Sequence, residues 1–216
     1  ELPNKQDALR YVLTVNAPEN KDNDFTWRDF QSRNNNELVA IYGNFVNRVV
    51  VLTNKYYDGI IPSTVDIDDQ ATEVLNKVNQ QIKLIYKLVE KFKFRESCNE
   101  YINIARYGNK YLTDQEPWKI IKHNPEKVKN IMFVALQICS VLSVIGEPFL
   151  PFTSKKLKEI LNYRSHDITW DWDTLSSGDI LIKSGVKINK AELLFEKIED
   201  SEIEYQLEKL NNSKSA

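Results

Sequence analysis

The sequence contains few of the residues on which metal sites and disulfide frameworks depend. Its 216 residues include two cysteines and two histidines. Cys98 and Cys139 form no C-x-x-C pair, and His123 and His166 have no second ligand at metal spacing, so no metal site is expected. The cysteine spacing alone leaves a disulfide open. Because both cysteines lie in apolar helical patterns, we predict buried free thiols instead.

Motifs of common catalytic sites are also missing. With six glycines, the chain has no G-x-S-x-G elbow, no P-loop and no G-x-G-x-x-G turn, so it offers no catalytic residue. No secretory segment opens the chain, and no apolar run comes close to the roughly 20 residues of a membrane span, so no membrane partner is expected. Because the first residue is Glu1 and not Met, we expect a fragment or a processed product.

An excess of either charge sign is lacking too. The chain carries 29 Lys and Arg against 31 Asp and Glu, a net charge of −2. This balance argues against sequence-indifferent nucleic-acid binding, which needs a strongly basic surface, and leaves open the reading of a few bases at one local site. The charge is unevenly distributed, because residues 166–216 have a net charge of −5 and residues 1–165 have a net charge of +3.

Apolar residues recur every three or four positions, and this period predicts an all-α fold. We expect a bundle of about five helices with a short irregular C-terminal tail. A short amphipathic helix precedes the bundle, and the predicted helices span residues 7–13, 26–57, 71–92, 95–112, 125–145 and 153–161. Residues 131–145 are apolar on nearly all sides, so that helix should lie in the middle. In the tail, residues 169–172 and 180–182 are β-like, and residues 201–210 form a polar helix.

Two polar features stand apart from this core pattern. Asn44 and Arg48 lie four residues apart, on one helix face beside the apolar stripe of Phe45 and Val49. An amide offers a donor and an acceptor and a guanidinium adds a planar fork, so the pair suits a nucleobase edge or a phosphate. Spacing alone favours a simpler interpretation, an exposed polar face of a helix.

The second feature is Trp118, which follows Pro117 between two predicted helices. A tryptophan at such a junction is either a core plug or a stacking platform for a base. From the residue types alone, the core plug is favoured.

Several motifs, in order over about residues 5–165, closely resemble methionyl-tRNA synthetases, a family of class I aminoacyl-tRNA synthetases. They are Asp7-Ala8-Leu9-Arg10-Tyr11, Lys21-Asp22-Asn23-Asp24-Phe25-Thr26-Trp27-Arg28-Asp29-Phe30, Asn44-Phe45-Val46-Asn47-Arg48, Tyr57-Asp58-Gly59, Glu116-Pro117-Trp118 and Pro148-Phe149-Leu150-Pro151. The tail over residues 187–200 also resembles that of the family, in which the tail folds back along the protein.

The resemblance implies that the bundle binds the CAU anticodon of methionine tRNA, initiator and elongator alike. In the family, the residues that align with Asn44 and Arg48 contact anticodon bases and backbone. The tryptophan that aligns with Trp118, preceded by Pro117, stacks on the first anticodon base. Three further residues have weaker claims as supporting contacts, and a surface role suits them about as well: Asn47, Arg106 and Lys110.

The resemblance also implies a division of the chain. Residues 1–30 would connect to an upstream catalytic domain, residues 31–165 would form the helical anticodon-binding domain, and residues 166–216 would be a tail or linker. The family's ATP-binding signatures and zinc knuckle would lie upstream, so no cofactor and no methionine activation are expected in this chain alone. As partners we expect the catalytic domain of the same chain, against which the tail would pack, and a second copy bound through an appended C-terminal domain. The full enzyme would be a cytoplasmic methionine–tRNA ligase of protein biosynthesis.

Two other interpretations stay open. The bundle could come from a neighbouring class I synthetase, such as that for valine, isoleucine, leucine or cysteine. It could also be a non-catalytic helical module that binds a protein, in which case Asn44 and Arg48 are plain surface residues. The joint presence of Asn-x-x-x-Arg and Pro-Trp favours the methionine enzyme.

Overall fold

A computed structural model describes residues 5–19, 22–63, 67–166, 169–177 and 180–214. Over these residues the fold is all-α, as predicted, and it contains no β-strand, only an isolated bridge between Ile60 and Lys187. The elements are, in order, α1 (Gln6–Val15), α2 (Trp27–Arg33), the π-helix η1 (Asn34–Gly43), α3 (Asn44–Tyr57), α4 (Asp69–Glu90), α5 (Phe94–Gln115), α6 (Pro117–Ile120), α7 (Pro125–Ile145), α8 (Pro151–Ile160), the 3-10 turn η2 (Tyr163–Ser165), α9 (Trp172–Ser177) and α10 (Asp200–Lys214).

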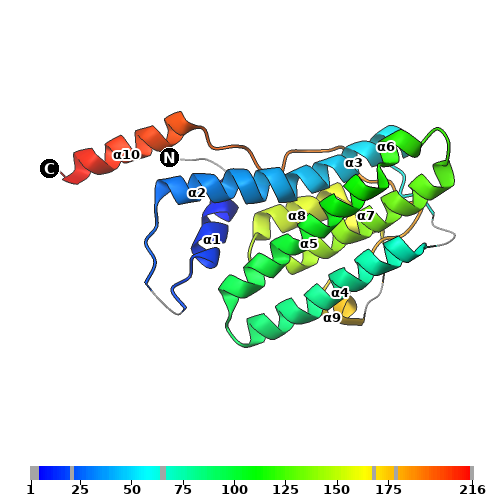
Figure 1. The fold of residues 1–216 in the computed structure, drawn as a ribbon, viewed down its shortest axis with the longest axis horizontal. Helices are drawn as coiled ribbons and strands as arrows, with labels where there is room; N and C mark the ends of the chain where they lie inside the picture. The colour runs from blue at the N-terminus through cyan, green and yellow to red at the C-terminus, as the bar shows by residue number, and fades with distance from the viewer. Residues whose placement is uncertain (1–4, 20–21, 64–66, 167–168, 178–179, 215–216) are drawn as a thin grey trace.

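Helix α7 lies in the middle of the bundle, in contact with α3, α4, α5 and α8 (Figure 1). Every residue from Ile131 to Ile145 is buried, which explains why this helix is apolar on all sides. By length and composition α7 could cross a membrane, with a mean hydropathy of 1.9, contrary to our expectation that no segment comes close. Because 89% of that segment is buried inside the bundle, its apolar composition is that of a core helix.

The first predicted long helix is a continuous rod made of α2, η1 and α3. Thr26 caps its start by accepting a hydrogen bond from the Asp29 amide at 3.1 Å. Gly43 and Asn44 keep right-handed helical dihedrals at the junction of η1 and α3, so the rod does not break there. It ends at Asp58, which adopts a left-handed conformation with φ of 51°.

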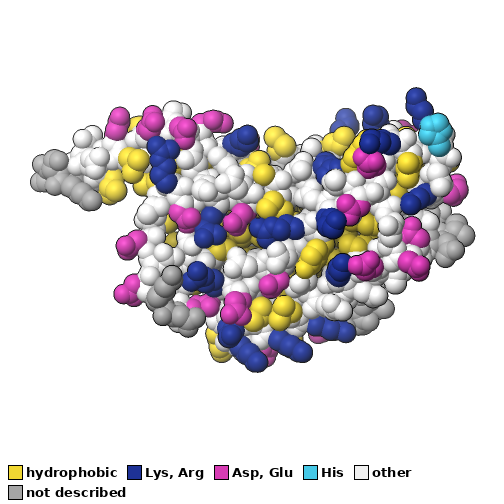
Figure 2. Space-filling view, viewed as in Figure 1, with side chains coloured by type: hydrophobic (Ala, Val, Ile, Leu, Met, Phe, Trp, Pro, Cys, Tyr) yellow, Lys and Arg dark blue, Asp and Glu magenta, His cyan; other side chains and the backbone are white. Residues whose placement is uncertain are grey.

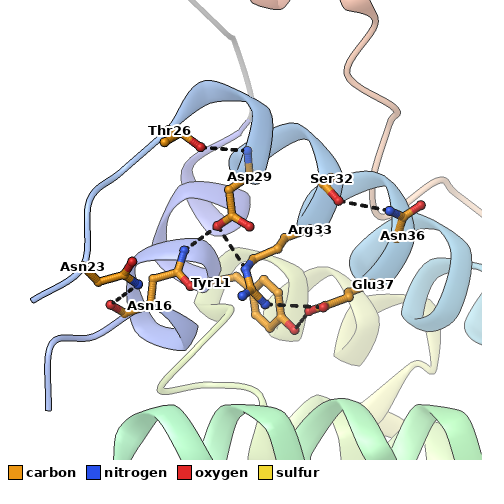
Figure 3. Close-up of polar contacts among 9 residues, drawn as sticks. All are labelled: Tyr11, Asn16, Asn23, Thr26, Asp29, Ser32, Arg33, Asn36 and Glu37. Atoms are coloured by element: carbon orange, nitrogen blue, oxygen red, sulfur yellow. Dashed lines mark hydrogen bonds and ion pairs between the residues drawn. The ribbon is translucent and has the colours of Figure 1, made fainter. Parts of the chain in front are cut away.

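A polar network fastens α1 to the rod (Figure 3). Arg33 bridges two carboxylates on its own helix face, Asp29 at 3.1 Å and Glu37 at 3.4 Å. Helix α1 adds two donors to these carboxylates, because the Tyr11 hydroxyl donates to Glu37 and the Asn16 amide donates to Asp29. Both acidic side chains are therefore shared between α1 and the rod, which fixes the angle between them.

Asp7 fastens the other side of α1 to α8. Its buried carboxylate accepts a hydrogen bond of 2.6 Å from the Thr153 amide in the first turn of α8. A carboxylate at this end of a helix satisfies an otherwise unpaired amide and interacts favourably with the helix dipole.

The structure of the tail differs from two of our expectations. Residues 172–177 form α9, and residues 169–171 and 180–182 form no strand, so the β-like assignment is wrong. The tail also packs on the bundle itself, without any catalytic domain, and buries Leu181, Ile188 and Ile198. In Figure 1 the segment before α10 runs beside the rod. The polar helix predicted over residues 201–210 is confirmed as α10.

Side-chain amides of the rod hold the tail backbone in place. The Asn35 side chain donates to the Ile198 carbonyl and accepts from the Ile198 amide, both at 2.9 Å. One turn earlier, Gln31 donates to the same carbonyl at 3.1 Å, and Asn34 donates to the Glu196 carbonyl at 2.9 Å. The tail thus replaces water as the partner of these amides.

We expect Asn35→Ala to lower the free energy of unfolding by about 1–2 kcal/mol, because the Ile198 amide loses its hydrogen-bond partner and the Ile198 carbonyl loses one of its two donors. Urea titration followed by circular dichroism measures this loss. Asn36→Ala is the matched control, because Asn36 is exposed on the same helix and, among the residues that the structure describes, its side chain bonds only to Ser32, at 3.2 Å. Equal stabilities of the two variants would contradict the tail docking described above.

Candidate nucleic-acid interface

Arg48 and Trp118, which lie 70 positions apart in the sequence, meet on the surface of the bundle. The Arg48 guanidinium carbon lies over the Trp118 ring, 5.0 Å from its centroid. This is the geometry of a cation–π contact, which favours a fixed position for both side chains. The two polar features that the sequence singles out thus lie next to each other on the surface.

Trp118 is held in place by its predecessor and stays accessible. Pro117 is buried in the first position of α6, where its missing amide hydrogen costs nothing. Glu116 before it adopts a left-handed conformation with φ of 43°, which turns the chain sharply after α5. Trp118 itself remains 38% exposed, so it is not the core plug that residue types alone favoured. Part of its ring surface is free to stack on a ligand.

A neutral side chain anchors the guanidinium of Arg48. Arg48 Nη1 donates to the Asn109 side-chain oxygen on α5 at 3.3 Å. The Asn109 amide nitrogen donates in turn to the Ile41 carbonyl at the end of η1, at 2.8 Å. Partial burial lowers the pKa of Arg48 from its ordinary value, but a guanidinium keeps its charge at neutral pH.

Asn44 lies one helical turn before Arg48 and is exposed. Asn47, adjacent to Arg48, is half-buried. Within the described part of the chain, neither side chain is engaged in a hydrogen bond with another protein group. Both amides therefore keep their donors and acceptors for solvent or for a ligand.

A glycine allows α3 and α5 to come this close. A Cβ atom on Gly108 would lie 2.3 Å from the Phe45 ring, well inside van der Waals contact. Phe45 is fully buried, so its ring fills the space that a side chain at position 108 would occupy. The approach brings Asn109, the next residue on α5, within reach of Arg48 on α3.

Two residues predicted as supporting contacts are placed differently. Arg106 is exposed and donates to Asn103 on its own helix at 2.7 Å, and Asn103 donates to Glu100 at 2.9 Å. Lys110 pairs with Asp114 at 2.8 Å and lines a shallow pocket shared with α4. The structure does not bring either side chain to the pair of Arg48 and Trp118.

Basic side chains surround the site on the side of α6. Figure 2 shows Lys and Arg side chains gathered over α6 and the start of α7, beside His123. Some are paired locally, such as Lys119 with Glu116 at 2.7 Å and Lys129 with Glu126 at 2.8 Å. His123 is exposed, and the next residue, Asn124, caps the start of α7, because its side chain accepts a hydrogen bond from the Lys127 amide at 3.1 Å.

No cluster of three or more metal-ligating side chains occurs among the described residues. Cys98 and Cys139 are free and fully buried, as predicted, and burial raises the pKa of both thiols. Such thiols carry little thiolate and are inert. His166 is buried where the tail begins, with its ring nitrogens near the Leu161 carbonyl, at 3.2 Å, and the Lys183 amide, at 2.8 Å.

Asn109 contacts Arg48 at this site, but the sequence analysis did not identify it as a site residue. One signal could have pointed to it, because Gly108 interrupts a helical pattern and an isolated glycine in a helix marks a close approach of another element. Which element approaches, and with which residue, depends on the packing of α3 against α5.

Comparison with known proteins identifies two matching families. The family described as the anticodon binding domain of methionyl tRNA ligase matches residues 61–215, and the family described as tRNA synthetases class I (M) matches residues 2–50. Two similar proteins carry the name methionine–tRNA ligase. That of Christiangramia forsetii is 58% identical and that of Flavobacterium johnsoniae is 53% identical, each over the whole of this chain. The chain spans 32% and 34% of the length of these two proteins, about a third of each.

Solved structures share the fold. The free form of Mycobacterium tuberculosis methionyl-tRNA synthetase superposes with a TM-score of 0.79, and the match covers 89% of this chain and 39% of that one. The sequences are 18% identical, so this likeness concerns the fold alone.

Proposed function

The chain belongs to the family of methionyl-tRNA ligase anticodon-binding domains, and from this premise we propose that the surface formed by α3 and α6 binds the CAU anticodon of methionine tRNA. The tRNA would be the initiator and the elongator form alike, because both carry this anticodon. Asn44 and Arg48 would contact anticodon bases and backbone, and Trp118, held by Pro117, would stack on the first anticodon base.

The observation that carries this proposal is the half-exposed Trp118 ring with the Arg48 guanidinium over it, 5.0 Å from the ring centroid. An anticodon loop presents unstacked bases, which proteins bind by stacking on aromatic rings and by hydrogen bonds to base edges. A stacked base gains about 1–3 kcal/mol on an aromatic side chain. The neighbouring guanidinium and the exposed Asn44 amide supply the directional donors and acceptors that stacking lacks.

The local charge supports the same partner. Basic side chains gather over α6 (Figure 2), the helix that contains Trp118, although the whole chain carries a net charge of −2. Phosphate contacts position an RNA and base contacts specify it, so a few basic groups near a reading site are sufficient. Asn47 is a further candidate contact by its place next to Arg48, whereas Arg106 and Lys110 would act only on RNA outside the loop.

The activity of the whole enzyme is part of this proposal. The chain would act as the anticodon-binding part of a cytoplasmic methionine–tRNA ligase, whose upstream catalytic domain uses ATP, and zinc in some members, to join methionine to tRNA. Residues 1–30 would lead from that domain, residues 31–165 would bind the anticodon, and residues 166–216 would return along the rod. A second copy would associate through an appended C-terminal domain, and no membrane partner is proposed.

One titration tests the proposal. We expect the chain to bind an RNA hairpin with the CAU anticodon at least ~10-fold more tightly than a hairpin with one anticodon base changed, because a polar group left unpaired on binding costs about 1–3 kcal/mol. Fluorescence anisotropy of labelled hairpins at fixed salt measures both dissociation constants.

The outcomes separate the interpretations. A preference for a valine, isoleucine, leucine or cysteine anticodon would assign the bundle to that synthetase instead. Equal, weak binding of all hairpins would leave the protein-binding module as the better account, and would overturn the proposed anticodon site. The fragment alone should show no methionine-dependent exchange of pyrophosphate into ATP.

A further inference from the structure

Asn109 occupies a defined position between α3 and α5. Its amide nitrogen donates to the Ile41 carbonyl at 2.8 Å, and its amide oxygen accepts from Arg48 Nη1 at 3.3 Å. A carbonyl can only accept and a guanidinium can only donate, so these two partners fix which way the amide points. The side chain is half-buried on α5, next to the glycine that lets α3 approach.

The guanidinium is therefore held on two sides. Asn109 fixes one nitrogen, and the Trp118 ring lies under the guanidinium carbon at 5.0 Å. Within the described residues, Arg48 forms no ion pair with an acidic side chain, unlike Arg33, which pairs with two carboxylates. The anchor of Arg48 is thus a neutral amide.

The neutrality of this anchor matters for binding RNA. A carboxylate would hold the guanidinium as firmly, but it would cancel the charge and repel phosphate oxygens nearby. An amide oxygen restricts the side chain and leaves its positive charge, and its remaining N–H donors, for acceptors on an RNA. Arg48 would then bind without first losing side-chain freedom, which otherwise reduces affinity.

We propose that Asn109 is a positioning residue for anticodon recognition, which presents the Arg48 guanidinium over Trp118 without neutralising it. This inference rests on the proposed function, because it concerns the same surface. It adds a residue on α5 to a site formed so far by α3 and α6. It also gives a role to the close approach of α3 and α5 at Gly108.

A double-mutant cycle on the 216-residue chain tests the inference, with the CAU hairpin as ligand. We expect Asn109→Ala to weaken binding by about 5- to 20-fold, as for loss of one hydrogen bond to a charged group. In an Arg48→Ala background the same substitution should change the dissociation constant less than about 2-fold, because residues that act through one another are not additive. Asn99→Ala, an exposed asparagine on the same helix, is the control and should bind as the parent chain does.

A second variant separates positioning from charge. Asn109→Asp keeps an acceptor facing Arg48 but adds a negative charge, so it should also weaken hairpin binding, and more so at low salt. If it binds as tightly as the parent chain, the importance of a neutral anchor is refuted. If Asn109→Ala weakens binding equally with and without Arg48, Asn109 does not act through Arg48 and the inference fails.

A measurement without RNA keeps this test independent of the proposed function. The Arg48 Nε–Hε group should show restricted motion in NMR relaxation of the free chain, and Asn109→Ala should increase that motion. The Arg33 side chain, anchored by Asp29 and Glu37, serves as an internal reference. A mobile Arg48 in the parent chain would overturn the positioning role, whereas a rigid Arg48 with no anticodon preference would overturn only the proposed function.

Discussion

Replacement of Trp118 by alanine should weaken binding of the CAU hairpin by about 10- to 100-fold, because the stacked base loses an interaction of about 1–3 kcal/mol. The Arg48 guanidinium loses the ring beneath it at the same time, so its donors become less well placed. Since Trp118 is 38% exposed, the fold should remain intact. Anisotropy titration and a thermal melt of the same sample measure both quantities.

Two further variants make the Trp118 result specific. Trp118→Phe keeps an aromatic face and should recover part of the lost affinity. Phe152→Ala removes an exposed aromatic side chain from α8 and should leave hairpin binding unchanged. In the full-length ligase, Trp118→Ala should reduce tRNA charging while methionine-dependent ATP–pyrophosphate exchange persists. Undiminished charging would show that Trp118 does not bind the anticodon.

The second large effect is expected at Gly108. Alanine at this position would place a Cβ atom 2.3 Å from the buried Phe45 ring, so the ring or the helix must move. Overpacking of this severity costs up to about 3 kcal/mol. The better helix propensity of alanine offsets about 1 kcal/mol of this loss in stability. We therefore expect a net loss of about 2 kcal/mol in the free energy of unfolding, measured by urea titration.

The same change should also disturb the RNA site. A shift of α5 away from α3 would separate Asn109 from Arg48, so hairpin affinity should fall in parallel with stability. Adding Phe45→Leu to Gly108→Ala removes the ring that the new methyl group meets, and should restore part of the stability. If the Gly108→Ala variant unfolds at the same urea concentration as the parent chain, the claim that α3 and α5 leave no room for a side chain at position 108 is refuted.

The helical core was predictable because its pattern is simple. The rod and α4 each have one apolar stripe, and α7 is apolar on all sides, so period and composition alone placed α7 in the middle. The π-helical register of η1 was not predictable. Residues 34–43 satisfy the same spacing of three and four in either helix type, and packing decides between them.

The tail shows why local pattern can mislead. Trp170 and Ile182 are buried, and such residues are typical of strands, yet no strand among the described residues pairs with them. Side-chain groups and individual backbone carbonyls provide the hydrogen bonds that a neighbouring strand would otherwise provide. The Trp170 indole donates to the Leu181 carbonyl at 2.7 Å, and the Leu181 amide donates to the Gln137 side chain at 3.0 Å. An irregular segment packed on a bundle can thus have the same composition as a strand.

The candidate site was half predictable. Asn44 and Arg48 share one helix face by spacing, and the Pro117–Trp118 step marks a junction, so both features could be read from the sequence. Whether these two features meet depends on how α3 packs against α5 and α6, and no local sequence pattern contains this information. Asn109 could not be identified from the sequence for the same reason, because its two hydrogen-bond partners are 61 and 68 positions away along the chain.

The way in which the tail is held has a consequence for how this segment can vary in evolution. Many of its bonds end on main-chain carbonyls, such as those of Lys187, Asn189, Glu196 and Ile198. A surface that contacts main-chain atoms does not distinguish one side chain from another, so substitutions at exposed tail positions should be nearly neutral. Alignment of the tail on the bundle is then set by its buried side chains, Ile188 and Ile198, ten positions apart, and by Phe195 between them, which packs on Tyr42. Insertions or deletions between them should be rarer than substitutions, because they change this interval.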